Sequence, residues 1–387
     1  MKFIHTGDWH IGKLVHQIHM TEDQRFILQD FIRVVAEEKP HAIIIAGDIY
    51  DRSVPPVEAV ELLDEVFSTI LIELNTPIIA ISGNHDSPDR LGFGSKILRN
   101  KGLYIEGKLT KNIKSVVLED EFGPVNFHPI PYADPAIVRE LMDDSTINNH
   151  DSAMKAIINQ VKSDMNPGQR NVIIAHGFVI GGESLETSES ERPLSIGGSE
   201  YIDVTAFMDF NYTALGHLHS PQKVAVDKIR YPGSLLKYSF SEARQKKSVT
   251  VVEMDKAGGT EIRKVSLTPK RDMRKIQGKL LQLTDPAIYK DTNIDDYVMV
   301  TLLDEGELLD AIGKLRGVYP NVLRLERSQL KGIRQTNGKM GSDYHRKSKL
   351  ELFREFYEAM EGDSFKDDYK EILIDVLSDI EKEERGK

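Results

Sequence analysis

Five short motifs rich in aspartate and histidine lie between residues 8 and 219 of this 387-residue chain. In chain order they read DWH (8–10), GDIYDR (47–52), GNHD (83–86), HG (176–177) and GHLH (216–219). A single D-x-H or H-x-H arises often by chance, whereas five such motifs in order, each beside a glycine and after an apolar run, indicate one metal site. The donors are nitrogen and oxygen atoms only, from Asp8, His10, Asp48, Asn84, His176, His217 and His219.

This donor set predicts a pair of divalent ions. Nitrogen and oxygen ligands without sulfur suit Mn²⁺, Fe²⁺ or Zn²⁺, and seven side chains exceed the need of one tetrahedral ion. They fit two ions roughly 3.5–4 Å apart. Asp48 is the expected bridge, because a carboxylate has two oxygens and a negative charge. Side chains two apart point oppositely along a strand, so we expect a turn after Gly216 and different ions for His217 and His219.

Other residues of the motifs are candidates for proton transfer and phosphate binding. His85 is the candidate general acid beside the leaving group, with a further ligand or a structural histidine as the alternatives. Arg52 either contacts phosphate or pairs with Asp51. Asp86 is expected to form a turn or to orient a ligand rather than to bind metal. Weaker candidates for phosphate contact, equally consistent with ordinary surface residues, are Lys13, His16 and Arg90.

The elements that position these motifs read as a layered α/β fold. Helical spacing of apolar residues predicts helices over 23–38 and 57–74. Short apolar runs without polar alternation predict strands buried on both faces at residues 3–4, 42–46, 77–81, 172–175 and 212–215. Ligands in open α/β sheets bind beyond the carboxyl ends of the strands. Motifs far apart in the sequence are therefore expected to converge.

The chain divides into four predicted parts, 1–269, 270–330, 331–344 and 345–387. Within the first, residues 183–203 predict a long surface loop near the functional edge, with a disordered insertion as the alternative. The second reads as a small α/β domain with strands at 279–283, 297–302 and 322–326 and a helix at 307–316. The third is a linker rich in glycine and polar residues. The fourth carries two amphipathic helical patterns, which fit either docking onto the chain itself or binding to a partner.

The composition excludes several other kinds of protein. Lys and Arg number 50 against 61 Asp and Glu, a net charge of −11, so bulk charge cannot hold an anionic polymer. A nucleic-acid site must be local, metal-assisted or shared with a partner. The chain has no cysteine, which excludes disulfides, thiolate metal sites and iron–sulfur clusters. We expect no signal peptide and no transmembrane helix, hence a cytosolic protein.

As a set, the five motifs resemble the signature of the calcineurin-like metallophosphoesterase superfamily over roughly residues 1–240. The resemblance implies a β-sandwich flanked by helices and two metal ions. Asp8, His10, Asp48 and His219 would surround the first ion. Asp48, Asn84, His176 and His217 would surround the second.

Finer features resemble the SbcD nuclease family, a branch of the double-strand-break repair nucleases. They are DWHIGK (8–13), GNHDSP (83–88), GHLHSPQ (216–222), YPGSLLKYSFSE (231–242), the small α/β capping domain and the terminal helices. This resemblance implies an ATP-dependent 3′–5′ exonuclease of double-stranded DNA that also cuts single strands and hairpins, acts in DNA repair, recombination and replication, and uses two Mn²⁺ ions, with Mg²⁺, Fe²⁺ or Zn²⁺ as substitutes.

The same resemblance implies partners. The nuclease would form a homodimer within a heterotetramer, associated with the nucleoid, and its C-terminal helices would bind the coiled coil of an SbcC-type ATPase. Asp51 stands in place of a second catalytic histidine of archaeal and eukaryotic relatives, so we expect it to orient His85. A small-molecule phosphodiesterase or protein phosphatase is the alternative on this fold, and a metal-free scaffold ranks last because no ligand is missing.

Overall fold

The computed structural model describes residues 1–194, 200–306 and 308–328, and isolated positions between 350 and 373. It contains two compact units, Met1–Arg274 and Lys275–Lys387, which are taken in turn below. The predicted linker over 331–344 and most of the predicted C-terminal helices lie outside the described residues.

Two six-stranded sheets form the first unit. The first sheet has the order β16-β15-β1-β4-β5-β6, with bounds Thr260–Ser266, Ser248–Met254, Lys2–Thr6, Ala42–Ala46, Ile78–Ile81 and Leu103–Glu106. The second has the order β13-β14-β12-β9-β8-β7, with bounds Gln222–Val224, Val226–Tyr231, Tyr212–Gly216, Arg170–His176, Gly123–Pro129 and Val116–Asp120. Strands β1, β4, β5 and β6 run parallel, as do β8, β9, β12 and β14.

One apolar core lies between the two sheets. Alternate residues of each central strand point into it, among them Phe3, Ile44 and Ile79 from the first sheet and Phe127 and Ile174 from the second. The ring of Phe127 packs edge-on against Phe3 with centroids 5.8 Å apart. The predicted α/β fold is therefore confirmed as a sandwich of two sheets whose central strands are buried on both faces, as their uninterrupted apolar runs indicated.

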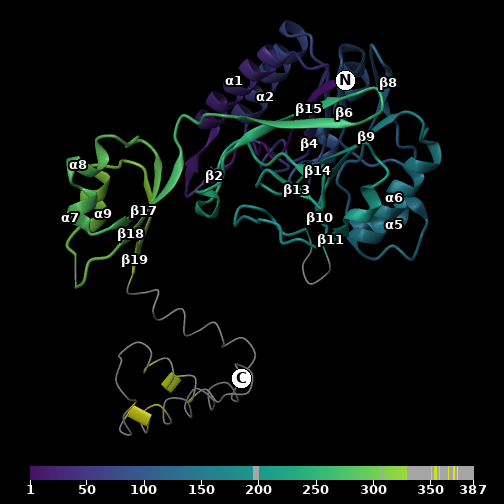
Figure 1. Ribbon diagram of the computed structural model, residues 1–387. Coiled ribbons are helices and arrows are strands. Elements are labelled where there is room, and N and C mark those ends of the chain that lie inside the picture. Colours follow the sequence, from purple (N-terminus) through teal and green to yellow (C-terminus); the bar gives the residue numbers. More distant parts are fainter. Residues whose placement is uncertain are drawn as a thin grey trace. The chain divides into compact units, whose positions relative to one another are not determined.

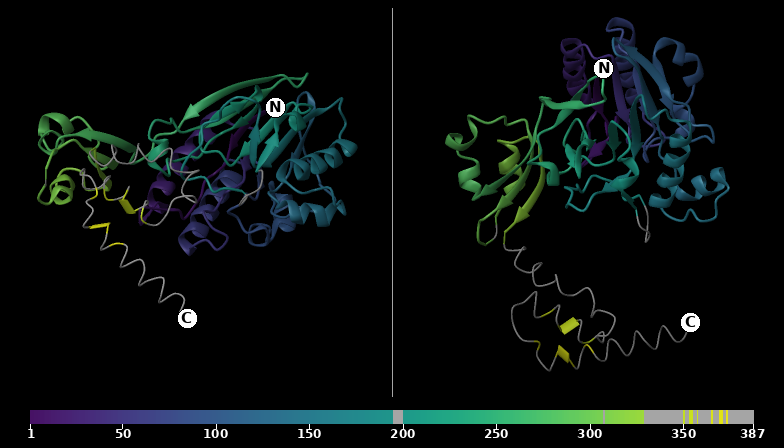
Figure 2. Two further views of the ribbon diagram at one scale, coloured as in Figure 1. Left: turned by 90° about the horizontal axis from the view of Figure 1, so that it is seen from below. Right: turned by 45° about the vertical axis from the view of Figure 1, so that its right-hand side comes forward.

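Helices cover the outer faces of the sandwich. Helices α1 (Thr21–Glu38) and α2 (Val57–Ser68) lie together on one side, and α5 (Pro135–Met142) and α6 (His150–Asp164) lie together on the other (Figure 1). Figure 2 shows the same separation between the purple and the blue-teal helices. The amphipathic pattern predicted over 57–74 is confirmed, with α2 continuing into a π-helical turn at Thr69–Glu73.

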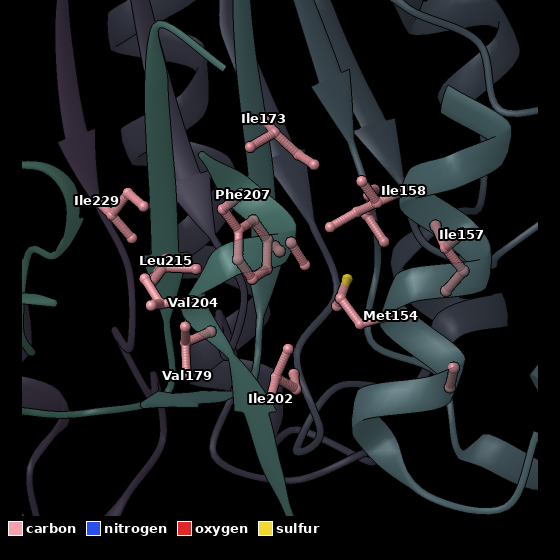
Figure 3. Packing of buried hydrophobic residues seen from close by; sticks show 14 of the residues in the cluster. Met154, Ile157, Ile158, Ile173, Val179, Ile202, Val204, Phe207, Leu215 and Ile229 are labelled. Atoms are coloured by element: carbon pink, nitrogen blue, oxygen red, sulfur yellow. The ribbon is translucent and has the colours of Figure 1, made fainter. Parts of the chain in front are cut away.

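Helix α6 packs on the second sheet through a second apolar cluster. Met154, Ile157 and Ile158 face strand residues that include Ile173 and Leu215, with the ring of Phe207 between the strands and the helix (Figure 3). Because this cluster is on the opposite face of the sheet from the central core, β9 and β12 are held from both sides. The residues at their carboxyl ends are fixed accordingly.

Short elements complete the unit. The region predicted as one loop over 183–203 is described as coil up to residue 194, but its last residues form β11 (Tyr201–Asp203), which pairs parallel with β10 (Phe178–Ile180). The loop prediction is wrong there because Ile202 is buried in the cluster under α6. The other elements are β2 (Leu14–Val15), β3 (Ile18–His19), α3 (Pro88–Leu91), α4 (Ser95–Leu98) and the 3-10 turns Arg99–Lys101, Val204–Phe207 and Phe240–Glu242.

The second unit is a three-stranded sheet covered by short helices. Its order is β17-β18-β19, and β17 begins just before the division between the units. The strands are Met273–Gly278, Tyr297–Leu302 and Val322–Arg327, and the helices are α7 (Leu280–Leu283), α8 (Pro286–Tyr289) and α9 (Ala311–Arg316). No helix among the described residues is both long and apolar enough to cross a lipid bilayer.

One strand of this unit was assigned wrongly from the sequence. Residues predicted as a strand over 279–283 form helix α7, and the first strand lies just before it. The helix is favoured because Leu280 and Leu283, one turn apart, are both buried in the small core. In addition, the Asp304 carboxylate accepts the Leu280 N–H at 2.8 Å.

Candidate metal centre

The five motifs meet where the carboxyl ends of the two sheets come together. Strands β1, β4 and β5 of the first sheet lead into the motifs at 8–10, 47–52 and 83–86, and β9 and β12 of the second lead into the other two. The sheets approach so closely that a Cβ on Gly216 would collide with the Ala46 carbonyl oxygen. Glycine at this position therefore permits residues from both sheets to share one site.

Four of the predicted ligand residues have left-handed backbone conformations. The φ angles are +53° at Asp8, +47° at His10, +50° at Asp48 and +116° at His217. Such angles cost side-chain-bearing residues of order 1–3 kcal/mol each and cluster at functional sites. Here they are held by main-chain hydrogen bonds between the loops: the Asp8 N–H donates to the Gly47 oxygen and the His10 N–H to the Asp48 oxygen.

Three oxygen atoms, from Ala46, Asn84 and Asp48, surround the ring of His176. Its Nδ1 lies 2.9 Å from the Ala46 carbonyl oxygen, which can only accept, so the ring hydrogen is on Nδ1 and Nε2 carries a lone pair. That lone pair lies 2.9 Å from Asn84 Oδ1 and 3.5 Å from Asp48 Oδ2. Nitrogen, amide and carboxylate donors gathered in this way suit a divalent metal ion.

A second convergence lies around His10. The Nε2 atoms of His10 and His219 are 3.0 Å apart, and His10 Nε2 is 3.7 Å from Asp48 Oδ2. Two buried polar atoms nearby, Asp8 Oδ2 and His10 Nδ1, have no hydrogen-bond partner. Buried polar atoms are almost always satisfied, so these two orphaned atoms fit a metal-binding environment. Asp8, His10 and His219 offer donor atoms within 4.8 Å of one another, and so do Asp8, Asp48 and His176.

Burial keeps the histidines of this cluster neutral. Loss of solvent is the main cause that holds the pKa of His10 and of His217 well below the ordinary value, with neighbouring histidines adding to it in both cases and Lys13 in that of His10. Burial followed by the charge of Asp48 raises the pKa of Asp8 and raises that of Asp86 to about 7. Neutral imidazole is the form that binds metal, and bound cations would offset the repulsion between the carboxylates.

His85 lies at the more open side of the cluster. Its Nδ1 donates to the Asp51 main-chain oxygen at 2.7 Å, which directs Nε2 toward Asp48 Oδ2, 4.0 Å away. The side chain is 11 % exposed, whereas that of His10 is 1 % exposed. Asp51 thus contacts His85 as anticipated, although through its backbone rather than its carboxylate.

The expected pairing of Asp51 with Arg52 is not what the structure shows. The Asp51 carboxylate accepts a hydrogen bond from Lys13 Nζ at 2.6 Å and lies 3.6 Å from His10 Nδ1. Arg52 is exposed. The reason is the bridge between Ile11 and Tyr50, which brings the loop after β1 alongside the loop after β4.

The remaining phosphate-contact candidates do not gather at one point. His16 is exposed beside Phe240, with ring centroids 5.6 Å apart. Arg90 lines an apolar groove between α2 and the short helices that follow β5. Only Lys13 among these candidates contacts a residue of the cluster directly, through its bond to Asp51.

Several residues that support the cluster were not found from the sequence. Gln24 donates to the His10 carbonyl at 2.7 Å and accepts from the Gly12 N–H at 2.9 Å, and Tyr238 donates to the Trp9 carbonyl. Asp86, by contrast, was expected from the sequence to form a turn or to orient a ligand, and its carboxylate accepts three main-chain N–H groups, from Ile49, Tyr50 and Gly83. Buried polar residues within amphipathic patterns, such as Gln24 in α1, are the signal that could have pointed to this support.

Comparison with known proteins agrees with this geometry. The sequence profile described as Calcineurin-like phosphoesterase matches residues 1–221, and that described as Type 5 capsule protein repressor C-terminal domain matches residues 269–361. The chain is 38 % identical over 325 residues to the D subunit of nuclease SbcCD from Staphylococcus epidermidis, which covers 84 % of this chain and 85 % of that protein.

Solved structures with a partial likeness include a dimetal phosphatase from Danio rerio, with a TM-score of 0.40, 9 % identity and coverage of 70 % of this chain and 98 % of that one. A protein from Thermus thermophilus has a TM-score of 0.37 at 12 % identity, covering 68 % of this chain and 98 % of that one.

Proposed function

The chain belongs to the calcineurin-like phosphoesterases and, within them, to the family of the SbcCD nuclease's D subunit, and from that premise we propose that it hydrolyses DNA phosphodiester bonds with two Mn²⁺ ions. Membership in these families makes the chain a phosphoester hydrolase. The observation that supports a dimetal site is the presence of two overlapping donor groups, Asp8, His10 and His219 in one and Asp8, Asp48 and His176 in the other.

The ions are assigned to the two convergences. One would be held by Asp8, His10, Asp48 and His219, and the other by Asp48, Asn84, His176 and His217. Asp48 Oδ2 lies within 4 Å of the Nε2 atoms of His10, His85 and His176, which supports its role as the bridge. Bound there, the ions would activate a water molecule and neutralise charge on the phosphate.

His85 is the proton donor in this proposal. The Asp51 oxygen engages Nδ1–H, so a general acid here requires the doubly protonated ring, in which Nε2–H is the group that gives a proton to the departing 3′ oxygen. General acid catalysis of this kind contributes typically 10²–10⁴ in rate. Lys13 stabilises the loop of Asp51 and, with Arg52 and His16, is proposed to contact the DNA backbone. Arg90 lines the apolar groove instead and is left out of this proposal.

Partners follow from the same premise. With a net charge of −11, the chain alone is expected to bind duplex DNA weakly. We assign much of the DNA binding to an SbcC-type ATPase, which residues 345–387 would bind. This ATPase would also control, with ATP, the access of DNA to the site for 3′–5′ exonuclease and hairpin cleavage. The cellular setting in this proposal is the cytoplasm, on nucleoid DNA during repair, recombination and replication.

A homodimer is supported by an exposed apolar groove on the first unit. The groove has a volume of about 960 Å³, and Val60, Ile72, Phe93 and Leu98 are among its lining residues. Phe93 is 87 % exposed and Ile72 78 %, a concentration of large apolar side chains typical of protein interfaces. Sedimentation of the F93S variant as a monomer, against a dimer for the unaltered chain, is the expected result.

The function is tested with purified full-length chain on linear duplex DNA and on a small phosphodiester, with and without Mn²⁺, SbcC and ATP. We expect Mn²⁺-dependent cleavage of the small ester by the chain alone and ATP-dependent cleavage of duplex DNA by the complex. D48A should remove both activities, whereas D164N, an exposed carboxylate at the end of α6, should retain them. Cleavage of the small ester without any cleavage of DNA by the complex would instead identify a small-molecule phosphodiesterase.

A further inference from the structure

Every polar atom of His219 except one is engaged by other residues. Its main-chain N–H donates to Glu191 Oε1 at 2.7 Å, and its carbonyl accepts from Lys247 Nζ at 2.8 Å. Its Nδ1 lies 2.7 Å from Ser190 Oγ. The remaining atom, Nε2, is the one that faces His10.

The direction of these hydrogen bonds can be deduced from the acceptor at the end of the chain. Glu242 is fully buried, and Lys247 Nζ lies 2.6 Å from its Oε2. This buried ion pair with Lys247 keeps Glu242 as a carboxylate. The carboxylate therefore only accepts, and Ser190 Oγ, 2.6 Å from Oε1, donates to it.

Ser188 Oγ also lies near Ser190 Oγ, at 2.9 Å, but the Glu242 carboxylate is both closer and charged. With its only hydrogen on Glu242, Ser190 accepts from His219. The ring hydrogen is then on Nδ1, and Nε2 presents a lone pair to the cluster. This arrangement differs from that of His176 and His85, whose Nδ1 atoms are fixed by the main-chain oxygens of Ala46 and Asp51. His219 alone of these three is oriented by a side chain.

That side chain comes from a separate segment of the fold. Ser190 and Glu191 lie on the coil after β10, which is attached to β12 and to the region before β15 by further contacts. Glu186 Oε2 accepts from Ser220 Oγ at 3.0 Å, and Ser188 Oγ donates to Glu242 at 2.8 Å. The coil thus places a hydroxyl against one ligand of the expected dimetal centre.

We propose that Ser190, through its hydrogen bonds to Glu242 and His219, is a positioning residue that fixes the Nδ1–H form of His219 and so preorganises the ion site of His219 and His10. The inference rests on the proposed dimetal function. Partners that orient metal-binding histidines typically contribute 10–100-fold in metal affinity. Loss of Ser190 should therefore weaken one Mn²⁺ site and leave the other, built on His176, unchanged.

The test compares S190A with S190T, which keeps a hydroxyl, and with S241A. Ser241 is an exposed serine beside the same coil, contacting the Glu189 N–H and Ser239 Oγ. Calorimetric titration of the full metal-free chain with Mn²⁺ measures both sites. Nitrogen-15 NMR of histidine-labelled, metal-free chain reports which ring nitrogen of His219 carries the hydrogen.

We expect S190A to lose 10–100-fold in affinity at one of two Mn²⁺ sites and to lose the protected Nδ1–H signal of His219. S190T and S241A should resemble the unaltered chain in both measurements. Two unchanged sites in S190A, or an unchanged His219 signal, would overturn the inference and leave the proposed function standing. Absence of a second Mn²⁺ site in the unaltered chain would overturn both.

Discussion

Replacing Asp48 with asparagine is expected to stabilise the metal-free protein while abolishing its response to Mn²⁺. In the unaltered chain the Asp48 charge lies among other buried carboxylates, and with burial it raises the pKa of both Asp8 and Asp86. Asparagine keeps the Oδ1 atom that accepts the His85 N–H at 2.9 Å but removes the charge. The variant therefore tests electrostatics with little change in shape.

The size of the gain follows from Asp86. Its pKa is raised from 3.8 to about 7, and one pKa unit corresponds to about 1.4 kcal/mol, so its ionisation at pH 8 costs roughly 4 kcal/mol. Burial is the larger cause and the charge of Asp48 the second, so D48N should recover a part of this cost. An acid with a raised pKa destabilises the fold increasingly as pH rises from its unfolded to its folded pKa. The gain from D48N should therefore be full above pH 7 and fade below it.

The stabilisation by Mn²⁺ that D48N loses should be larger than the stabilisation that it gains without metal. An ion at 100 times its dissociation constant stabilises a fold by about 2.7 kcal/mol, so two ions contribute about 5 kcal/mol. For the first unit, Met1–Arg274, that is a rise of roughly 10 °C in Tm. Without the bridging charge, we expect Mn²⁺ at the same concentration to raise the Tm of D48N by less than about 3 °C.

Thermal unfolding followed by calorimetry at pH 8, first with EDTA and then with Mn²⁺, measures both effects. D164N serves as a charge-matched control away from the cluster. The reasoning would be refuted if metal-free D48N unfolded at a lower temperature than the metal-free unaltered chain, which is what the loss of a structural contact would cause. A rise with Mn²⁺ equal to that of the unaltered chain would refute the bridging role.

Replacing His85 with glutamine should lower phosphodiester turnover by about 10²–10⁴ while two Mn²⁺ ions still bind, as steady-state kinetics and calorimetric titration can measure; loss of an ion would make His85 a ligand instead. D120N should lower the free energy of unfolding at pH 7 by about 3 kcal/mol, because it breaks the buried pair with Arg170, whose Nη1 donates to Asp120 at 2.9 Å. The hydrogen bond from Arg170 outweighs burial and holds the pKa of Asp120 well below its ordinary value. The pair therefore stabilises the fold above about pH 4, and its contribution is lost as pH falls. In urea unfolding, the difference in stability between D120N and the unaltered chain should shrink by about 1 kcal/mol at pH 3, and a difference that stays constant with pH would contradict this account. F207A should lower the free energy of unfolding by about 3–5 kcal/mol in the same assay, because Phe207 is fully buried under α6. A loss below about 1 kcal/mol would mean that the cluster in Figure 3 can repack.

The strand ends of the cluster were predictable because each rests on local sequence. An uninterrupted apolar run such as 42–46 indicates a buried strand wherever it pairs, and the glycine and aspartate that follow mark its end. The assignment of β9 and β12 to a second sheet was not contained in those runs, because parallel neighbours are chosen by the packing of the whole sandwich.

Errors arose where a distant partner decided the outcome. Pairing of Asp51 with its neighbour Arg52 was one of two alternatives for Arg52, but Asp51 pairs with Lys13, which another loop brings to it. Residues 279–283 were assigned to a strand, yet the carboxylate of Asp304 and the small core favour helix α7. The role of Ser190 depends on Glu242, 52 positions further along the chain, a relation that no short-range pattern encodes.

The meeting of both sheets at one site sets an order on folding during synthesis. His10 and His219 are separated by 209 positions, so at about 5–20 residues per second the first donor waits roughly 10–40 s on the ribosome for the second. In the proposed assignment, the ion site of His10 and His219 is complete only after β12 has been synthesised. Complete metal loading would then follow synthesis of both sheets.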